Sequence, residues 1–394
     1  MHNKYIVLSK ENNIKFNMYN KVAVIFYLFY EDKLDYYFNY IYNIPKEVQL
    51  YIITSNEKVK DIICSKMSKS ERKVEVRMKI NRGRDISALL ISAKDILCKY
   101  NYVCFLHDKK NKTQAMKLDT ELWENNIFEN LIGSSRYVDT VLNCFENNDN
   151  IGLLIPPAPY SKNIPRWYTN SWLKNYDNTI DVLNRTGCNI DIKYDDFPIS
   201  IGTVFWARTK ALEKLFAYNW TYDDFDEEPL KNDGTISHAI ERALPYIVED
   251  AGYSTRIIMN NEWTQDFIST LQTDLVKAFQ ILYSQYGVRN LSELTRMHDR
   301  DNEIIKFALP DNKVYIYGAG DRAKDCTRNL ERLGIGIKGY IVTKLDDNDN
   351  RKNVQSVENF TLKDEKIVIA VGINYQEDIL NILKEKLFFN IYVF

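Results

Sequence analysis

The chain has 394 residues, a formal net charge of −2 and a hydrophobic fraction of 45%. A chain of this length exceeds the roughly 150 residues of one ordinary domain, so we expect two or three domains. The near balance of 52 basic and 54 acidic residues leaves no overall positive field, which argues against nucleic acid as a partner. The composition is typical of a globular protein rather than of a disordered chain or a membrane bundle.

No segment predicts a membrane span or an export signal. The longest apolar run, residues 22–30, is far shorter than the roughly 20 residues of a spanning helix. The six cysteines show no CxxC or other metal-binding spacing, so we expect reduced and mostly buried thiols. These features favour a cytoplasmic protein. Peripheral association with the inner face of the cell membrane and a homo-oligomer are open alternatives.

Expected strands alternate with expected helices from residue 21 to about residue 260. We expect strands from residue 21 and at 48–54, 73–78, 102–106, 151–155, 201–207 and 254–259. Helices are expected at 36–42, 56–67, 85–99, 118–148 and 236–244 and from residue 210. This alternation predicts an α/β fold with a mostly parallel sheet. Ligands of such sheets bind beyond the carboxyl ends of the strands, so we look for chemistry there.

A second alternating pattern follows a turn at residues 310–312. It predicts a small Rossmann-like unit whose first turn, 318–323, is similar to a shortened dinucleotide fingerprint. Gly318 and Gly320 are therefore candidate cofactor-binding residues. We expect a catalytic domain over residues 1–262, a helical bridge over 263–309 and an accessory domain over 310–394.

The segment 81–85 follows an expected strand and opens an expected helix. Gly83 allows a tight turn, Arg84 is free to point at a ligand, and Asp85 suits the first helical turn. A helix N-terminus beside a guanidinium suits a phosphate or a nucleobase edge. Asn81, Gly83, Arg84 and Asp85 are therefore candidate substrate-binding residues. The alternative is a simple helix cap after a glycine turn.

Four polar residues follow the next expected strand: His107, Asp108, Lys109 and Lys110. Open α/β nucleotide-sugar enzymes often keep a carboxylate pair here that binds a divalent metal. This chain has one carboxylate, and its two lysines could neutralise a diphosphate directly. We treat all four as candidate substrate-binding residues, with a polar strand end in solvent as the alternative. Manganese, magnesium or no metal remain open.

A later expected strand carries Gly202 and Trp206. The tryptophan face could stack on a sugar ring at the floor of a pocket, because aromatic faces commonly pack on sugars. A place in the hydrophobic core is an equally good explanation of the same residue. Both residues are candidates for substrate binding.

The segment 228–242 combines charged residues with a helix start. We place Asp233 at the start of the helix, where the dipole keeps its carboxylate ionised as a general base. His238, Glu241 and Arg242 follow one to two turns later, and one or two of them can face the same way. Asp233 and His238 are candidate catalytic residues, and Glu228 and Arg242 are candidates for substrate binding. Asp108 and His238 would be the ligands if a metal binds; a capped surface helix is the alternative.

As a set, these motifs resemble the rhamnan-synthesis protein F family of glycosyltransferases. The segments that carry the resemblance are NRGRDISALL (81–90), FLHDKKN (105–111), FPISIGTVFWAR (197–208) and EPLKNDGTISHAIERALPYI (228–247). The resemblance covers roughly residues 20–260. It implies a GT-A type fold and transfer of rhamnose from a nucleotide-sugar donor to a growing bacterial cell-surface polysaccharide.

The same resemblance implies an inverting reaction in which Asp233 deprotonates the acceptor hydroxyl. Arg84, Lys109 and Lys110 would offset the charge of the leaving diphosphate. The implied partners are a nucleotide-sugar donor and a glycan or lipid-linked glycan acceptor. The chain departs from the family at Asp108, where a small hydroxyl residue is usual.

Two other functions remain open from the sequence. One is an NAD-dependent sugar-nucleotide oxidoreductase that uses the turn at 318–323. The other is a non-catalytic glycan-binding scaffold with Trp167, Trp172 and Trp206 as sugar platforms.

Overall fold

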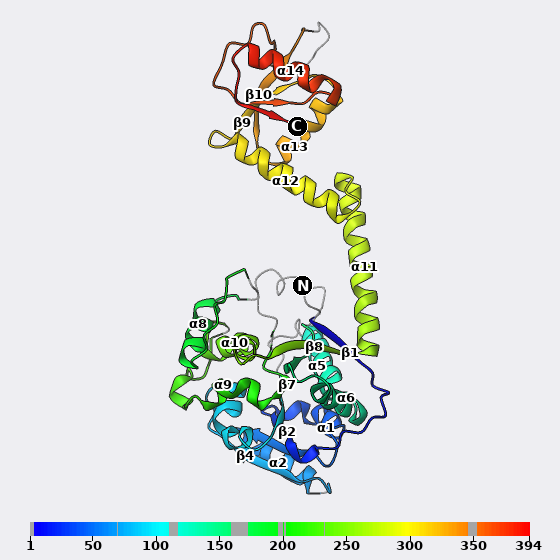
Figure 1. The fold of residues 1–394 in the computed structure, drawn as a ribbon, viewed down its shortest axis with the longest axis vertical. Coiled ribbons are helices and arrows are strands. Elements are labelled where there is room, and N and C mark those ends of the chain that lie inside the picture. The colour runs from blue at the N-terminus through cyan, green and yellow to red at the C-terminus, as the bar shows by residue number, and fades with distance from the viewer. Residues whose placement is uncertain are drawn as a thin grey trace. The chain divides into compact units, whose positions relative to one another are not determined.

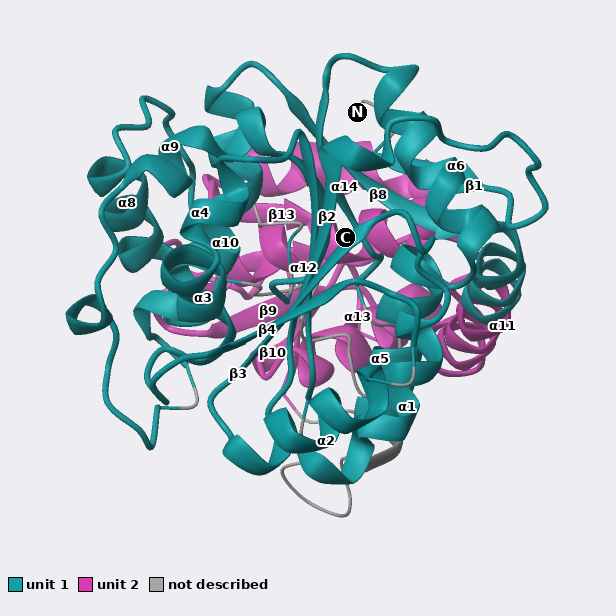
Figure 2. Cartoon of the chain, turned by 90° about the horizontal axis from the view of Figure 1, so that it is seen from below, with its two compact units in different colours: residues 1–271 teal, residues 272–394 magenta. Residues whose placement is uncertain are grey.

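The computed structural model describes residues 4–68, 70–109, 117–158, 172–195, 200, 202–231, 233–345 and 353–394. The chain divides into two compact units, residues 1–271 and 272–394, which are described separately (Figure 2). Within the described part, no helix has both the length and the apolar character needed to cross a membrane.

Unit 1, drawn from blue to green in Figure 1, is built on a sheet. Among the described residues this sheet has eight strands, in the order β1-β8-β6-β7-β5-β2-β3-β4. The strands are β1 (Tyr5–Leu8), β2 (Val22–Tyr27), β3 (Gln49–Thr54), β4 (Val74–Met78), β5 (Tyr102–His107), β6 (Ile151–Ile155), β7 (Phe205–Arg208) and β8 (Ser254–Asn260). Neighbouring strands are parallel except around β7, which is antiparallel to β5 and β6. The expected α/β fold with a mostly parallel sheet is confirmed.

Four neighbouring parallel strands, β5, β2, β3 and β4, position the candidate site. Every residue of β2 is buried, as expected for a strand covered on both faces. The register pairs Tyr27 with His107 and Thr54 with Met78. The segments that follow these strands therefore meet at one edge of the sheet, the carboxyl edge.

Helices cover both faces of this sheet and enclose two hydrophobic cores. The helices are α1 (Leu34–Ile41), α2 (Glu57–Met67), α3 (Arg84–Ser87), α4 (Lys94–Leu97), α5 (Lys117–Ile132), α6 (Ser135–Glu146), α8 (Tyr176–Arg185), α9 (Glu213–Ala217), α10 (Ile236–Asp250) and the beginning of α11 (Asn261–Tyr286). One core packs against α1, α2, α5 and α6, and the other against α3, α4, α8, α9 and α10. Figure 2 shows these two groups of helices on opposite sides of the sheet.

Two expected helices are interrupted. The one expected over 85–99 is split into α3, a π-helical stretch Ala88–Ser92 and α4. Such wider turns insert one residue into a helix and are frequent at functional sites. The one expected over 118–148 ends at Ile132, and α6 begins after Ser134, whose side chain accepts a hydrogen bond from the Tyr137 N–H.

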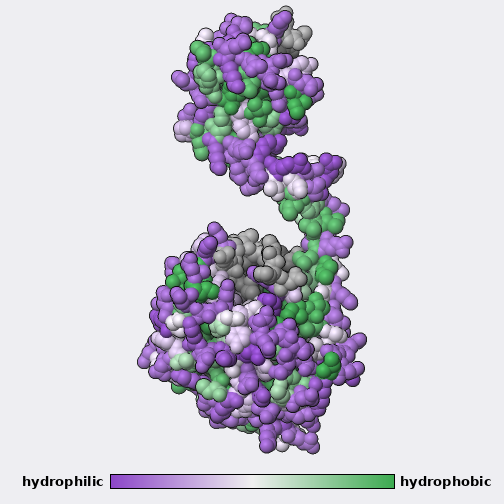
Figure 3. Space-filling view, viewed as in Figure 1, coloured by the Kyte–Doolittle hydropathy of each residue, from purple (hydrophilic) through white to green (hydrophobic). Residues whose placement is uncertain are grey.

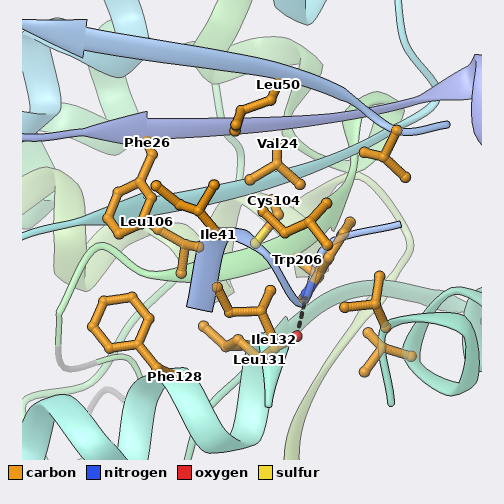
Figure 4. Packing of buried hydrophobic residues seen from close by; sticks show 14 of the residues in the cluster. Val24, Phe26, Ile41, Leu50, Cys104, Leu106, Phe128, Leu131, Ile132 and Trp206 are labelled. Carbon is orange, nitrogen blue, oxygen red and sulfur yellow. Dashed lines mark hydrogen bonds between the residues drawn. The ribbon is translucent and has the colours of Figure 1, made fainter. Parts of the chain in front are cut away.

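Trp206 lies in the first core, not at a sugar site. Its side chain is fully buried, and its indole Nε1 donates a hydrogen bond to the carbonyl oxygen of Leu131 at 3.0 Å (Figure 4). The expectation that Trp206 binds substrate is therefore wrong, because β7 directs this side chain toward α5. Trp172 is also fully buried and donates to the carbonyl oxygen of Tyr194. Trp167 lies outside the described residues.

We expect Trp206→Phe to lower the free energy of unfolding by about 1–3 kcal/mol. The substitution leaves the Leu131 carbonyl oxygen without its donor and part of the indole volume empty. Urea unfolding of the full chain measures the effect, with Trp263→Phe as a control at a half-buried tryptophan. A transition for Trp206→Phe that coincides with that of the wild type would contradict the core position.

Unit 2 contains, among its described residues, a five-stranded parallel sheet in the order β11-β10-β9-β12-β13. Its strands are β9 (Lys313–Tyr317), β10 (Gly336–Val342), β11 (Val354–Ser356), β12 (Ile367–Ile369) and β13 (Ile391–Val393). Its helices are the rest of α11, α12 (Leu291–Ala308), α13 (Asp321–Arg332) and α14 (Ile373–Glu385). This strand order is the one found in Rossmann-type folds. Figure 3 shows hydrophobic surface along α11. Among its exposed apolar side chains are Ile268 in unit 1 and Leu275 and Ile281 in unit 2.

Gly318 and Gly320 lie in the turn between β9 and α13. Gly318 has φ +137°, and a Cβ there would lie 2.4 Å from the carbonyl oxygen of Ala370. Glycine is therefore required where the ends of β9 and β12 approach each other. Gly320 is exposed, and a Cβ there would meet nothing within 4 Å. Packing thus explains Gly318, while the cofactor role of both glycines stays a prediction.

Candidate active site

Asp85 lies at the centre of a cluster of polar and charged side chains at the carboxyl edge. Its Oδ2 is 3.8 Å from Nε2 of His107. Its charge also influences the pKa of residues at the ends of β2, β4 and β5 and of one residue on α10. These residues are Tyr27, Lys79, Arg84, His107, Asp108, Lys109 and His238. The segments 81–85 and 107–109 are thus brought together with α10.

The ring of His107 is held in one orientation by the backbone. Its Nδ1 lies 2.9 Å from the carbonyl oxygen of Asp108. A carbonyl oxygen only accepts hydrogen bonds, so Nδ1 carries the proton. Burial lowers the pKa of His107, although Asp85 opposes this shift. A neutral ring then presents its Nε2 lone pair beside the Asp85 carboxylate, and the two groups can accept hydrogen bonds from ligand hydroxyls.

Asp108 connects the end of β5 to the segment that follows β2. Its buried Oδ2 accepts hydrogen bonds from the N–H groups of Phe29 at 2.6 Å and Tyr30 at 2.8 Å. Burial raises the pKa of Asp108 to about 7 in spite of these two bonds. The described residues contain no group of three or more His, Cys, Asp or Glu side chains arranged to hold a metal. Among the described residues, Asp108 and His238 therefore have no third side chain of these types placed to complete a metal site.

Asp108→Asn is expected to change how stability depends on pH. The pKa of Asp108 is about 7 in the folded chain and about 4 in the unfolded chain. The folded wild type therefore holds the proton more tightly from about pH 4 to 7, and its stability falls as the pH rises through that interval. Relative to wild type, the variant should gain about 3 kcal/mol of unfolding free energy between pH 4.5 and 8, because each pKa unit corresponds to about 1.4 kcal/mol. Urea unfolding across this range measures the difference, and a constant difference would contradict the buried carboxylate.

Lys109 packs on the ring of Trp123. Its Nζ is 3.6 Å from the ring centroid, and its backbone N–H donates to the hydroxyl of Tyr37. Burial lowers the pKa of Lys109, while the acidic neighbours, Glu241 foremost, favour its charged form. Gly202 also lies here, since a Cβ on it would be 3.5 Å from the Trp123 ring. Lys110 lies outside the described residues.

Arg84 is paired rather than free. Its Nε and Nη2 donate to the two carboxylate oxygens of Glu228 at 2.9 and 3.0 Å. The sequence expectation of a free guanidinium is corrected in this respect, although about half of the side chain remains exposed. Gly83 has φ +71°, and a Cβ there would lie 2.6 Å from the ring of Phe225. The turn at 81–84 is thus fitted to the segment that contains Glu228, whereas Asn81 is exposed at its margin.

Helix α10 begins after Thr235, not at Asp233. The side chain of Thr235 caps the helix by accepting the N–H of His238, and its Oγ1 lies 2.7 Å from Nδ1 of that histidine. The helix begins at Ile236 as expected, and the alternative in which Asp233 caps it is wrong, because Thr235 is the cap. Burial lowers the pKa of His238.

Asp233 lies just before the helix and is held by the start of α8. Its Oδ1 accepts a hydrogen bond from Nδ2 of Asn175 at 2.7 Å, and its Oδ2 accepts one from the N–H of Lys174 at 3.0 Å. Burial by itself raises the pKa of Asp233. These two hydrogen bonds and the N–H of Gly234 lower it, and together with the nearby His238 they outweigh burial, so that the net pKa is below its usual value. The carboxylate is ionised at neutral pH.

The buried Arg242 and the half-buried Glu241 form an ion pair on α10. Arg242 is 2% exposed and its Nη1 bonds to the carboxylate of Glu241. The guanidinium of Arg242 is thus enclosed and paired with its neighbour, while its charge acts on the pKa of His238; its contact with substrate stays a prediction. Glu241 also influences the pKa of His107, Lys109 and His238. We expected Glu241 on the same stretch of helix as His238 and Arg242 but did not name it as a site residue, although its spacing of three residues from His238 was the available signal.

Lys79 is a further site residue that the sequence reasoning missed. Its buried Nζ donates to the carbonyl oxygens of Ile80 at 2.9 Å and Arg82 at 3.2 Å, and lies 5.2 Å from the ring centroid of Tyr27. Burial lowers its pKa to about 8. Lys79 thus fixes the segment that leads into Gly83. Its position directly after β4 was the only signal in the sequence.

The family model of rhamnan synthesis protein F matches residues 1–253, which is more than half of the chain and includes all four motif segments. The chain belongs to this family. Members of the rhamnan synthesis protein F family are named for a polysaccharide pathway, so the resemblance stated from the motifs is confirmed.

Among individual relatives, the chain is 28% identical over 233 residues to the uncharacterized protein WxcX of Xanthomonas campestris pv. campestris strain B100. The same identity and length are found for WxcX of strain ATCC 33913. Each match covers 59% of this chain and 32% of the relative. The match therefore spans about a third of the length of these relatives.

Proposed function

We propose that the chain is an inverting glycosyltransferase of the GT-A type that acts in rhamnan synthesis. It would transfer a sugar, rhamnose in keeping with the family, from a nucleotide-sugar donor to a growing glycan or lipid-linked glycan. The observation that carries the proposal is the meeting of Asp85, His107 and Lys109 with α10 at the carboxyl edge of a parallel sheet. This edge is where α/β folds bind nucleotides.

In the proposed reaction an acceptor hydroxyl attacks the anomeric carbon of the donor sugar. Asp233 takes the hydroxyl proton as the new glycosidic bond forms, and the bond from the anomeric carbon to the diphosphate breaks. Lys109 offsets the negative charge on the leaving diphosphate, and Arg84 lies on the same edge. Support for Asp233 as the base comes from its lowered pKa, which keeps it ionised, and from its two hydrogen bonds, which fix its orientation.

The test is a nucleotide-release assay with the full chain and a panel of dTDP-, UDP- and GDP-sugars. We expect one donor to release nucleotide diphosphate when a glycan acceptor is present, and we expect Asp233→Asn to slow that release by orders of magnitude. Parallel reactions with manganese and with EDTA measure metal dependence. No release from any donor in the presence of acceptor would argue against the transferase and favour glycan binding without catalysis.

Unit 2 is proposed as an accessory domain, with dinucleotide binding as the second candidate. The second candidate is favoured by the strand order β11-β10-β9-β12-β13 and by the turn with Gly318 and Gly320. A thermal-shift screen of the full chain with NAD and nucleotide sugars tests it. Strong stabilisation of unit 2 by NAD alone would favour the oxidoreductase.

A further inference from the structure

Asn175 is the side chain that connects α8 to Asp233. It is fully buried at the residue before the first turn of α8. Its Nδ2 donates to Oδ1 of Asp233 at 2.7 Å and to the carbonyl oxygen of Trp172 at 3.0 Å. Both partners are acceptors, so the amide nitrogen must face them and a flipped amide would place oxygen against oxygen.

This orientation leaves the other end of the amide unsatisfied. Within the described residues, Oδ1 of Asn175 is buried and has no hydrogen-bond partner. An unpaired buried carbonyl reduces stability, and such a group in a native structure calls for an explanation. The amide nitrogen facing Asp233 supplies one, because a hydrogen bond to a charged carboxylate is among the stronger ones.

Asn175 differs from the other groups around Asp233 in the kind of contact that it makes. Among the described residues, the charged or titratable group that lowers the pKa of Asp233 is His238 on α10, and the backbone donors are the N–H groups of Lys174 and Gly234. Asn175 supplies the side-chain hydrogen bond to the carboxylate. Asn178, one turn later on α8, donates to the carbonyl oxygen of Gly234 instead.

We propose that Asn175 is a positioning residue that fixes the orientation of the Asp233 carboxylate and keeps it ionised for proton transfer. The inference rests on the proposed function, in which Asp233 is the base. Without the amide, the carboxylate can rotate about its last bond and binds a proton at higher pH, because a hydrogen bond to the charged form is lost. Substrate affinity should be little affected, since Asn175 is buried behind the carboxylate.

The test compares Asn175→Ala with Asn178→Ala in the full chain. Asn178→Ala is the matched control, because it removes a hydrogen bond from the same helix to the same turn without touching the carboxylate. We expect Asn175→Ala to lower kcat roughly 10- to 100-fold, with donor KM within about twofold of wild type. The acid limb of its kcat profile should move up by about one pH unit. An acid limb at the wild-type pH, or an equal shift in Asn178→Ala, would overturn the proposal.

A second measurement separates this inference from the proposed function. NMR titration of the full chain with ¹³C-labelled aspartate, assigned through Asp233→Asn, follows the Asp233 carboxyl without any substrate. A raised pKa of Asp233 in Asn175→Ala supports the positioning role, and an unchanged pKa overturns it even if the wild type transfers no sugar. If Asn175→Ala does not fold, Asn175→Asp keeps the side-chain shape and should raise the pKa of Asp233 further, because two carboxylates then share the site.

Discussion

Replacing Asp233 by asparagine is expected to lower kcat by about 10²–10⁴-fold, the usual contribution of a general base. Asparagine keeps the size of the side chain but cannot accept the proton of the acceptor hydroxyl. In the wild type, Asn175 Nδ2 and the Lys174 N–H donate to an ionised carboxylate, and in the variant both donors face an uncharged amide instead. Donor binding, measured by isothermal titration calorimetry, should stay within about twofold of wild type.

Asp177→Asn provides the control for this experiment. Asp177 is an exposed carboxylate in the first turn of α8, so its substitution removes the same charge close to the site but outside it. We expect its kcat to equal that of the wild type. Full activity of Asp233→Asn would remove this residue from the role of base and leave Asp85 and Glu241 as the carboxylates to test.

Lys109→Gln is expected to lower kcat by about 10²–10³-fold, the effect of removing one group that stabilises transition-state charge. The Nζ of Lys109 lies in a partly buried cluster against Trp123, where a charge interacts more strongly than in water. Glutamine keeps the backbone hydrogen bond from residue 109 to Tyr37, which holds this segment in place. The loss should therefore come from the missing charge rather than from a displaced strand end.

The control is Lys99→Gln, which removes an exposed lysine paired with Asp95 on the helical turn before β5. We expect unchanged kcat and an unchanged midpoint of thermal unfolding. Kinetics with the donor found in the release assay measure both variants. A Lys109→Gln enzyme with wild-type kcat would show that the diphosphate is neutralised by other cations.

The sheet and the position of the site were open to prediction because the strands of unit 1 carry direct signals. Continuous apolar runs such as β2 mark strands buried on both faces, and polar residues such as His107 and Asp108 begin where these runs end. Parallel strands separated by helices bring such ends to one edge. This rule places Asp85 and His107 at the same edge, whereas their close approach depends on the turn that carries Asp85 back from β4 toward β5.

Other features depended on contacts that the sequence does not contain. Neither the antiparallel direction of β7 nor its place between β6 and β5 can be derived from a four-residue strand. Trp206 belongs to the core because β7 is an inner strand of a sheet that is covered on both faces. The hydrogen bond from Asn175 to Asp233 joins residues 58 positions apart. Thr235 caps α10 because its hydroxyl accepts the N–H of the residue three positions later. The sequence alone did not distinguish it from Asp233, because both residue types are good helix caps.

The central claim is that a nucleotide sugar binds at the carboxyl edge of β5, β2, β3 and β4 in unit 1. Hydrogen–deuterium exchange of the full chain, with and without each member of the dTDP-, UDP- and GDP-sugar panel at saturating concentration, tests it most directly. We predict protection of residues 28–31, 79–85 and 107–109 by one donor. Protection confined to residues 318–323 of unit 2 would contradict the account and move the nucleotide site to the second domain.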